Sequence, residues 1–411
     1  MQTQLADFIR DTREGQEADT ILRKCVHCGF CTATCPTYQL LGDELDGPRG
    51  RIYLMKQVLE GAEPTERTQL HLDRCLTCRA CETTCPSGVE YGRLVDIGRS
   101  VVAQRVPRKG RDRLMRWALK EFVPRPALFG AAMKAGRLVR GILPTALKEK
   151  VPEVRPAGAW PTPRHTRRVI ALAGCVQPAM APSINAAAAR VLDAIGISMV
   201  EQPGAGCCGA LRQHLDEHEG ARADARRNID AWWPAVARGE IEAIVMTASG
   251  CGVQVRDYGH LLTDDAAYAE KAAHISALTR DIGEIVAAEQ DVLVQVLGRR
   301  GGSAGKLAFQ APCTLQHGQK IRGVIESILT AAGFEVVPVR DGHLCCGSAG
   351  TYSLLQPELS HRLRDNKLTA LTEHGATAIA SANIGCITHL DPASAVPVRH
   401  WIEYVDERLR A

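Results

Sequence analysis

The chain has 411 residues, of which 45% are hydrophobic and 23% are charged, and its formal net charge is +4. This supply of apolar side chains suffices for two or three globular cores and excludes collagen-like, coiled-coil and disordered chains. No stretch approaches the roughly 18 apolar residues of a transmembrane helix. The first residues have neither the basic head nor the apolar run of a signal peptide. We therefore expect a reducing compartment, in which clustered cysteines favour metal ligation over disulfides.

The first eight of the sixteen cysteines form two copies of the motif C-x2-C-x2-C-x3-C-P. The copies are Cys25, Cys28, Cys31 and Cys35 before Pro36, and Cys75, Cys78, Cys81 and Cys85 before Pro86. This is the spacing of bacterial ferredoxins, in which the fourth cysteine of a motif binds the other cluster. We predict two [4Fe-4S] clusters rather than structural zinc. The first is assigned to Cys25, Cys28, Cys31 and Cys85, and the second to Cys75, Cys78, Cys81 and Cys35.

The segment between the two motifs is predicted to be helical. Residues Arg51–Glu60 carry apolar side chains at helical spacing and are followed by Gly61. Residues 1–104 are therefore expected to form an all-helical, two-cluster ferredoxin domain. Arg49, Arg51 and Arg79 lie close in sequence to the ligands. A cation beside an anionic cluster would favour its reduced form; the alternative is that these arginines are solvated surface groups.

The other eight cysteines also form a repeat. Cys175, the pair Cys207 and Cys208, and Cys251 are followed by Cys313, the pair Cys345 and Cys346, and Cys386, and each pair precedes a glycine. Strands and helices alternate around them, which predicts two tandem α/β units, residues 167–290 and 306–411, packed as a pseudo-symmetric pair. Strands predicted at 243–247 and 377–381 each end shortly before a cysteine. Because parallel sheets place ligands at these carboxyl ends, the four cysteines of a repeat are expected to converge there.

What these eight cysteines hold is left open by the sequence. Adjacent thiols such as Cys207 and Cys208 fit poorly around one tetrahedral zinc ion, but they can bridge neighbouring irons of an unusual cluster. The alternatives are a further iron-sulfur cluster, a redox-active dithiol or a vestigial site, and zinc.

Residues 105–166 form a basic, proline-rich connector that is predicted to be helical. From position 105 to 168 there are seventeen Lys and Arg residues against four Asp and Glu. A helix over 111–122 would place Leu114, Met115, Ala118, Leu119 and Phe122 on one face and Arg113, Arg116 and Lys120 outside. Such a helix suits packing on its own protein, docking to a partner subunit or contact with an anionic membrane surface. Nucleic acid is not expected, because aromatic residues are not interleaved with the cations.

Other motifs carry less information. His214-Leu-Asp-Glu-His218 matches an inverted zinc-protease pattern, but a solvated helix face is the simpler interpretation. His317, His389 and Trp401 are expected to be core or surface groups rather than ligands. No G-x-G-x-x-G follows a predicted strand, so a flavin or nicotinamide site is not expected on this chain.

The combination of motifs resembles a known family over essentially the whole chain. The two ferredoxin motifs, the string Gly47-Pro-Arg-Gly-Arg-Ile-Tyr53 and the Cys-Cys-Gly repeats are similar to the iron-sulfur subunits of bacterial glycolate oxidases. Pro312-Cys-Thr-Leu-Gln-His-Gly318 and Ser381-Ala-Asn-Ile-Gly-Cys386 carry the same resemblance. Related subunits occur in anaerobic glycerol-3-phosphate dehydrogenase, lactate-oxidising systems and heterodisulfide reductase.

The resemblance implies an electron-transfer subunit with no catalytic residues of its own. A separate FAD subunit would oxidise glycolate to glyoxylate, and this chain would pass the electrons towards a respiratory acceptor, on the cytoplasmic side and peripherally at the membrane through the complex. The alternatives are the same role with lactate or glycerol 3-phosphate, or disulfide reduction as in heterodisulfide reductase. There the related repeats end in C-x-x-C and carry a non-cubane cluster, whereas Ala248 and Asn383 replace one cysteine of that pair here.

Overall fold

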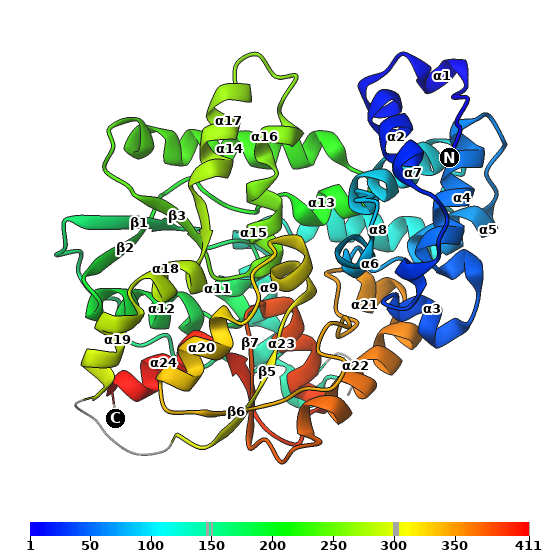
Figure 1. Ribbon diagram of the computed structural model, residues 1–411. Helices are drawn as coiled ribbons and strands as arrows, with labels where there is room; N and C mark the ends of the chain where they lie inside the picture. Colours follow the sequence, from blue (N-terminus) through cyan, green and yellow to red (C-terminus); the bar gives the residue numbers. More distant parts are fainter. Residues whose placement is uncertain (145–147, 149–150, 299–303, 411) are drawn as a thin grey trace.

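The computed structural model describes residues 1–144, 148, 151–298 and 304–410 (Figure 1). Parts of the predicted connector, residues 145–147 and 149–150, and the last residue of the second repeat lie outside this description. Within the described residues that precede position 167, helices are the only regular structure. The expected division into a helical N-terminal part and a mixed C-terminal part is confirmed.

The N-terminal part, residues 1–104, is built around one long helix. Its α-helices are α1 (Asp7–Arg10), α2 (Arg13–Lys24), α3 (Pro36–Leu41), α4 (Pro48–Leu59), α5 (Glu66–Asp73), α6 (Ala80–Thr84) and α7 (Tyr91–Arg105), with 3-10 turns at Phe30–Thr32 and Glu44–Asp46. Helix α7 packs against α2, α4 and α5 and buries Leu94 and Val95 completely. The predicted helix between the motifs is α4, which begins at Pro48, three residues before the expected start.

The C-terminal part contains two four-stranded parallel sheets of identical topology. The first has the order β2-β1-β3-β4, with β1 (Arg167–Ala171), β2 (Ile197–Glu201), β3 (Ala243–Met246) and β4 (Thr279–Asp281). The second has the order β6-β5-β7-β8, with β5 (Lys306–Gln310), β6 (Glu335–Val337), β7 (Ala378–Ser381) and β8 (Val398–His400). In each sheet the strand order reverses between two neighbouring strands, β1 and β3 in the first sheet and β5 and β7 in the second. Parallel sheets open a ligand crevice at such a point.

Helices of similar placement surround the two sheets. In the first repeat they are α11 (Gln177–Met180), α12 (Ser183–Ala194), α13 (Ala210–His214), α14 (His218–Ala237), α15 (Ser249–Arg256), α16 (Tyr258–Leu261), α17 (Ala269–Leu278), α18 (Ile282–Ala288) and α19 (Gln290–Leu297). In the second they are α20 (Val324–Ala331), α21 (Tyr352–Leu355), α22 (Pro357–Thr372), α23 (Ile384–Leu390) and α24 (Trp401–Arg410). A π-helical turn at Thr314–Gly318 and a 3-10 turn at Asp391–Ala393 complete this part.

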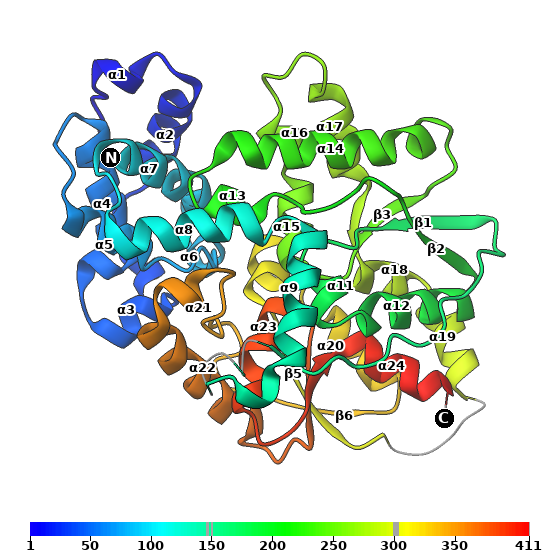
Figure 2. The ribbon, with the colours of Figure 1, turned by 180° about the vertical axis from the view of Figure 1, so that it is seen from behind.

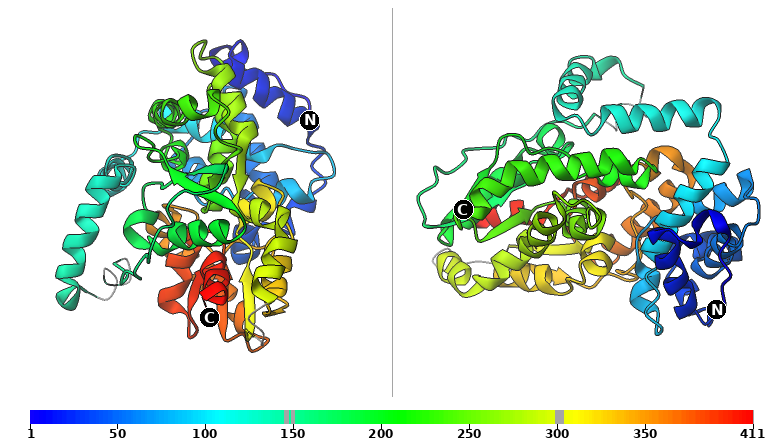
Figure 3. Two further views of the ribbon diagram at one scale, coloured as in Figure 1. Left: turned by 90° about the vertical axis from the view of Figure 1, so that its left-hand side faces the viewer. Right: turned by 90° about the horizontal axis from the view of Figure 1, so that it is seen from above.

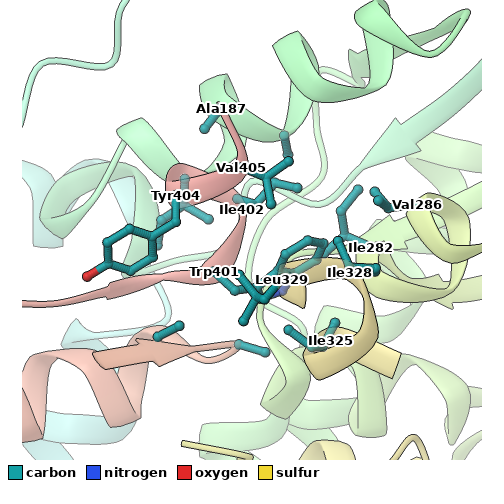
Figure 4. Close-up of a cluster of buried hydrophobic side chains, with 14 of the residues drawn as sticks. Ala187, Ile282, Val286, Ile325, Ile328, Leu329, Trp401, Ile402, Tyr404 and Val405 are labelled. Atoms are coloured by element: carbon teal, nitrogen blue, oxygen red, sulfur yellow. The ribbon is translucent and has the colours of Figure 1, made fainter. Parts of the chain in front are cut away.

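The two repeats share one hydrophobic core through a reciprocal exchange of helices. Helix α18 of the first repeat packs on α20 of the second, and α24 of the second packs on α12 of the first. Figure 4 shows the centre of this core, where Trp401 and Leu329 lie among apolar side chains from both repeats. The Ser183 hydroxyl donates a hydrogen bond of 2.7 Å to the Glu403 carboxylate across the same interface. The expected pseudo-symmetric pair is confirmed.

The connector forms a pair of helices, α8 (Gly110–Phe122) and α9 (Pro126–Leu138), which run from the N-terminal part along the repeats (Figure 2). Figure 3 shows them at the edge of the molecule, outside the two sheets. The predicted helix is correct, but two of its residues lie on the opposite face from the one predicted. Leu114 is 63% exposed, whereas Arg116 turns inward and pairs with Asp73. Among the described residues, no helix is both long and apolar enough to cross a bilayer.

Candidate functional site

The eight N-terminal cysteines surround two small adjoining cavities. The first cavity is lined by the four cysteines predicted for the first cluster, Cys25, Cys28, Cys31 and Cys85, together with Cys81. The second is lined by the four predicted for the other cluster, Cys35, Cys75, Cys78 and Cys81. Each cavity thus combines three cysteines of one motif with the fourth of the other. Sulfur-only donor sets of this kind suit iron-sulfur clusters and exclude hard cations.

The two ligand loops have the same backbone conformation. His27 and Thr77 follow the first cysteine of their motifs by two residues, and both adopt a positive φ, 56° and 50°. Gly29 and Arg79 follow the second cysteine and also adopt a positive φ, 86° and 59°. Such conformations are costly for Thr77, which is β-branched. They curl the loop around the cavity, and the Thr77 amide donates to Cys75 Sγ at 3.4 Å.

Burial keeps these thiols protonated unless a metal compensates for the charge. Desolvation raises the pKa of Cys31 to about 11 and holds the pKa of Cys78 and Cys81 well above the usual thiol range. Cysteine binds iron as a thiolate, so the ionised form of these groups is favourable only with a cation beside them. The residues present therefore fit a metal cluster better than a set of free, reactive thiols.

The three arginines singled out in the sequence all line these cavities, but in different ways. Arg51 is 1% exposed and lines the second cavity, so the surface interpretation is wrong for it. Its guanidinium donates to Thr37 Oγ1 at 3.1 Å, and that hydroxyl lies 3.3 Å from Cys35 Sγ. Arg49 lines the first cavity while it pairs with Glu44, and Arg79 lines the second.

Asp46 balances the buried charge of Arg51. The Asp46 carboxylate is fully buried and accepts from Arg51 at 3.4 Å and from Arg74 at 2.8 Å. His71 Nδ1 lies 3.1 Å from the same carboxylate. These contacts explain the buried carboxylate as the centre of an ion-pair network, so a bound metal ion is not needed to explain it.

The eight cysteines of the repeats open onto one large cavity of about 660 Å³. In the first repeat, side-chain hydrogen bonds connect Cys175 to Cys207, Cys207 to Cys208, and Cys208 to Cys251. The same chain of contacts runs through Cys313, Cys345, Cys346 and Cys386 in the second, where the first two sulfur atoms lie 3.9 Å apart. The structure thus brings all four cysteines of each repeat together at the carboxyl ends of the strands.

Steric constraints explain why a glycine follows each cysteine pair. Gly209 and Gly347 adopt a φ of 90° and 88°, and the amide of each donates to the first sulfur of its pair. A Cβ atom on Gly347 would lie 2.5 Å from the Ser360 carbonyl oxygen. The Cys-Cys-Gly turn therefore needs glycine both for its backbone conformation and for the close approach of the next helix.

The two tetrads, defined as the four cysteines of each repeat, differ in electrostatics. The pKa of Cys207 is held well below its usual range, because Cys175 and Cys208 donate hydrogen bonds to its sulfur and Arg227 lies nearby. In the second tetrad the pKa of the equivalent Cys345 is held well above its usual range, because the hydrogen bond with Cys313, which lowers it, is outweighed by the hydrogen bond with Cys346 and by desolvation. The first repeat thus supports a thiolate more readily than the second.

The N-terminal part is joined to the second repeat at the cysteines themselves. Cys78 lines both the second small cavity and the large one. Leu76, from the same ligand loop, lies in a buried cluster with Cys345 and Tyr352. The Thr83 hydroxyl lies 2.9 Å from Nδ1 of His317, and Nε2 of His317 donates to the His343 carbonyl at 2.8 Å.

Sequence reasoning missed this junction and misjudged one motif. His317 and His389 are buried core groups, as expected, but the contact of His317 with Thr83 has no signal in the local sequence. His214 ends α13 and lines the large cavity, whereas His218 begins the separate helix α14. Asp216, with a φ of 60°, separates the two helices, so the histidines share no helix face, although His214 is exposed to solvent as expected.

Comparisons with known proteins agree with this arrangement. Residues 21–89 match the model of a 4Fe-4S dicluster domain, and residues 169–256 and 307–391 each match that of a cysteine-rich domain. The chain is 55% identical over 410 residues to the glycolate oxidase iron-sulfur subunit of Escherichia coli K12, which covers 100% of this chain and 99% of that protein. It is 32% identical over 401 residues to a probable glycolate oxidase iron-sulfur subunit of Bacillus subtilis, with 90% and 88% coverage.

A more distant relative shares only part of the chain. Lactate utilization protein A of Exiguobacterium is 25% identical over 242 residues, which are 57% of this chain and 96% of that protein. The full-length matches, the duplicated cluster motifs and the paired cysteine-rich repeats agree with one another. The chain belongs to the family of glycolate oxidase iron-sulfur subunits.

Proposed function

We propose that this chain relays electrons within a glycolate-oxidising complex, from an FAD-containing partner subunit to a respiratory acceptor. Glycolate would be oxidised to glyoxylate on the partner, and this chain would bind neither FAD nor glycolate. The observation that supports the relay best is the position of Cys78, which lines both a predicted cluster cavity and the cavity of the repeats. One polypeptide thereby forms a continuous series of sulfur sites.

The proposed ligands are the two sets of four cysteines that surround the small cavities, Cys25, Cys28, Cys31 and Cys85 for one [4Fe-4S] cluster and Cys75, Cys78, Cys81 and Cys35 for the other. When bound, such a cluster exchanges one electron at a time, whereas a reduced flavin holds two. The buried side chains of Arg51 and Thr37 would stabilise added negative charge beside Cys35.

The first cavity is the proposed face for the flavoprotein. Cys28 is exposed, and the neighbouring Val26 and Phe30 are exposed apolar side chains in the same loop. The second set of cysteines lies deeper, against the second repeat. An exposed first site and a buried second one suit entry of electrons from outside the chain and transfer inwards.

The tetrads of the repeats are proposed to be redox sites as well. The sulfur contacts within each tetrad and the low pKa of Cys207 support a bound cluster or a reactive dithiol in preference to zinc.

Membrane association is proposed to be peripheral and on the cytoplasmic side. The outer face of the connector supports it, since Leu114, Trp117 and Ile142 are exposed there among basic residues.

The relay is tested with the complex purified anaerobically with its flavoprotein partner. Addition of glycolate is expected to bleach the visible absorbance of the clusters in the wild type and in the control Thr32→Ser, which keeps a hydroxyl in the same loop. Cys28→Ser is expected to abolish electron delivery to the acceptor while the flavin is still reduced. Unchanged turnover in Cys28→Ser would show that the electrons bypass this chain.

Relay from another 2-hydroxy acid is the second candidate. It is favoured by the similarity to lactate utilization protein A, although that match covers 57% of this chain against 100% for the Escherichia coli subunit. Replacing glycolate by lactate in the same bleaching experiment distinguishes the two substrates.

A further inference from the structure

The large cavity has one chemically distinct wall that the electron relay does not explain. Its floor consists of the two cysteine tetrads and Cys78. The connector contributes another wall, which is entirely apolar, with Leu119, Val123, Phe129, Ala132, Met133 and Val151. A volume of about 660 Å³ falls in the range that holds small organic ligands, which is roughly 300–1,000 Å³.

Polar side chains also line the cavity, and some of them can carry protons. His214 and Asp96 both line it, and Asp96 acts electrostatically on the His214 imidazole. His389 lines the cavity from the second repeat. The cavity therefore combines an apolar wall, sulfur sites for which a redox role is proposed above, and side chains of a kind that can carry protons.

The outer surface of the same connector is suited to a lipid surface. Trp117 is 58% exposed and Leu138 is 89% exposed, and Leu128 and Ile142 are exposed beside them in the chain. Arg111, Arg113 and Lys134 are also exposed on these two helices. Apolar and aromatic side chains among cations are the composition of segments that lie on anionic membranes. One helical pair thus separates the cavity from a face fitted to lipid.

We propose that this cavity binds a lipid-soluble quinone, which is the acceptor of the relay. The inference rests on the proposed function for its supply of electrons. The quinone would gain two electrons, delivered singly from the sulfur sites on the floor, and two protons, one on each carbonyl oxygen, to leave as the quinol. His214 and Asp96 would hand on protons taken from water, and the apolar connector wall would hold the ring and the first part of the tail.

The binding claim is tested on the full chain, purified anaerobically with its iron. The probe is 2-heptyl-4-hydroxyquinoline N-oxide, a quinone analogue whose fluorescence is quenched on binding. Ala132→Trp places an indole at the cavity wall, and the matched control Ala131→Trp changes the neighbouring residue of the same helix, which is equally exposed but does not line the cavity. We expect saturable binding by the wild type and by Ala131→Trp, and binding at least tenfold weaker by Ala132→Trp. Iron content and cluster paramagnetic resonance signals should be the same in all three.

Two results would overturn the proposal. One is equal affinity of Ala132→Trp and the wild type for the probe, or no saturable binding by the wild type. The other is displacement of the probe by glutathione disulfide together with reduction of that disulfide by the dithionite-reduced chain, which would make the cavity a disulfide site. Failure of the relay itself is seen separately, as absence of glycolate-dependent bleaching in the complex, because that measurement does not require the cavity.

Discussion

The Thr83 hydroxyl lies 2.9 Å from Nδ1 of His317, so the helix that carries Cys81 is tied directly to the turn that follows Cys313. Because Nε2 of His317 donates to the His343 carbonyl, Nδ1 is the acceptor of the threonine proton. Burial lowers the pKa of His317, which keeps the imidazole neutral and this tautomer in place. The contact joins the N-terminal part to the second repeat.

Removing this hydroxyl should weaken the junction. Thr83→Val leaves Nδ1 of a buried histidine without a partner, at a cost of about 1–3 kcal/mol. The control Thr84→Val removes the neighbouring hydroxyl of the same helix. Urea denaturation under anaerobic conditions, followed by the visible absorbance of the clusters, should show a lower midpoint for Thr83→Val than for the control. Equal midpoints would mean that the contact contributes nothing to docking.

The exchange of the fourth ligand between motifs makes a non-additive prediction. Cys25→Ser and Cys85→Ser should each remove the same cluster, so the double variant should lose no more iron than either single variant, about four atoms. Combining Cys25→Ser with Cys75→Ser should remove about eight. Iron and sulfide analysis of the single and double variants shows which cysteines share a cluster. If Cys85→Ser and Cys75→Ser instead deplete the same cluster, each motif binds its own cluster and the assignment is wrong.

Asp46 should be essential for the stability of the N-terminal part. Asp46→Ala leaves the Arg51 guanidinium buried without its counter-ion, which typically costs about 3–5 kcal/mol. The control Asp43→Ala removes an exposed carboxylate from the same turn. Thermal unfolding followed by circular dichroism should show a markedly lower Tm for Asp46→Ala alone. A Tm within a degree of the control would contradict the role of the buried network.

Gly347 offers a steric test of the second tetrad. Alanine at Gly347 and at Gly350 both force a side chain onto a left-handed residue, at about 1–2 kcal/mol each. Only at Gly347 would the Cβ also meet the Ser360 carbonyl, since the space around Gly350 is open. Gly347→Ala should therefore be the less stable variant and should alter the reactivity of Cys345 and Cys346 towards a thiol reagent, whereas Gly350→Ala should not. Equal reactivity in both variants would refute the steric argument.

Asp281 should make stability depend on pH. Burial raises the pKa of Asp281 to about 7 in the folded chain, above the usual aspartate value. The folded state then holds a proton that the unfolded state has lost between about pH 4 and pH 7, so stability should fall as pH rises through this range, by at most about 4 kcal/mol. Asp281→Asn, which keeps a capping side chain, should flatten the dependence, whereas the exposed control Asp291→Asn should not. Urea midpoints at pH 5 and pH 8 measure this.

The local sequence was sufficient to predict the features that occur twice in the chain. The cysteine spacing and the prolines after Cys35 and Cys85 predicted two copies of one loop, and the loops share their left-handed residues. Strand β1 and helix α12 follow from an apolar run and an alanine-rich segment that breaks at Gly196. These elements depend on neighbouring residues, which is why the sequence pattern identifies them.

The features that were missed depend on distant parts of the chain. Strands β4 and β8 have three residues each and include Arg280 and Arg399, so neither has a strand-like pattern. Their place is set by pairing with β3 and β7. Arg116 was placed outside because helix periodicity cannot reveal Asp73, and the exposed Leu114 follows from the same rotation of α8. The joining of Cys78 to the cavity of the repeats likewise needed the tertiary structure.

The proposed electron relay requires metal clusters held by the eight N-terminal cysteines, and the composition of the chain purified without oxygen tests this most directly. Iron and sulfide should each amount to at least about eight atoms per chain, and dithionite should produce the paramagnetic resonance signal of reduced [4Fe-4S] clusters. An iron content clearly above eight atoms per chain would place additional clusters in the tetrads. A colourless preparation that contains no iron, from cells that assemble such clusters in other proteins, would contradict the account.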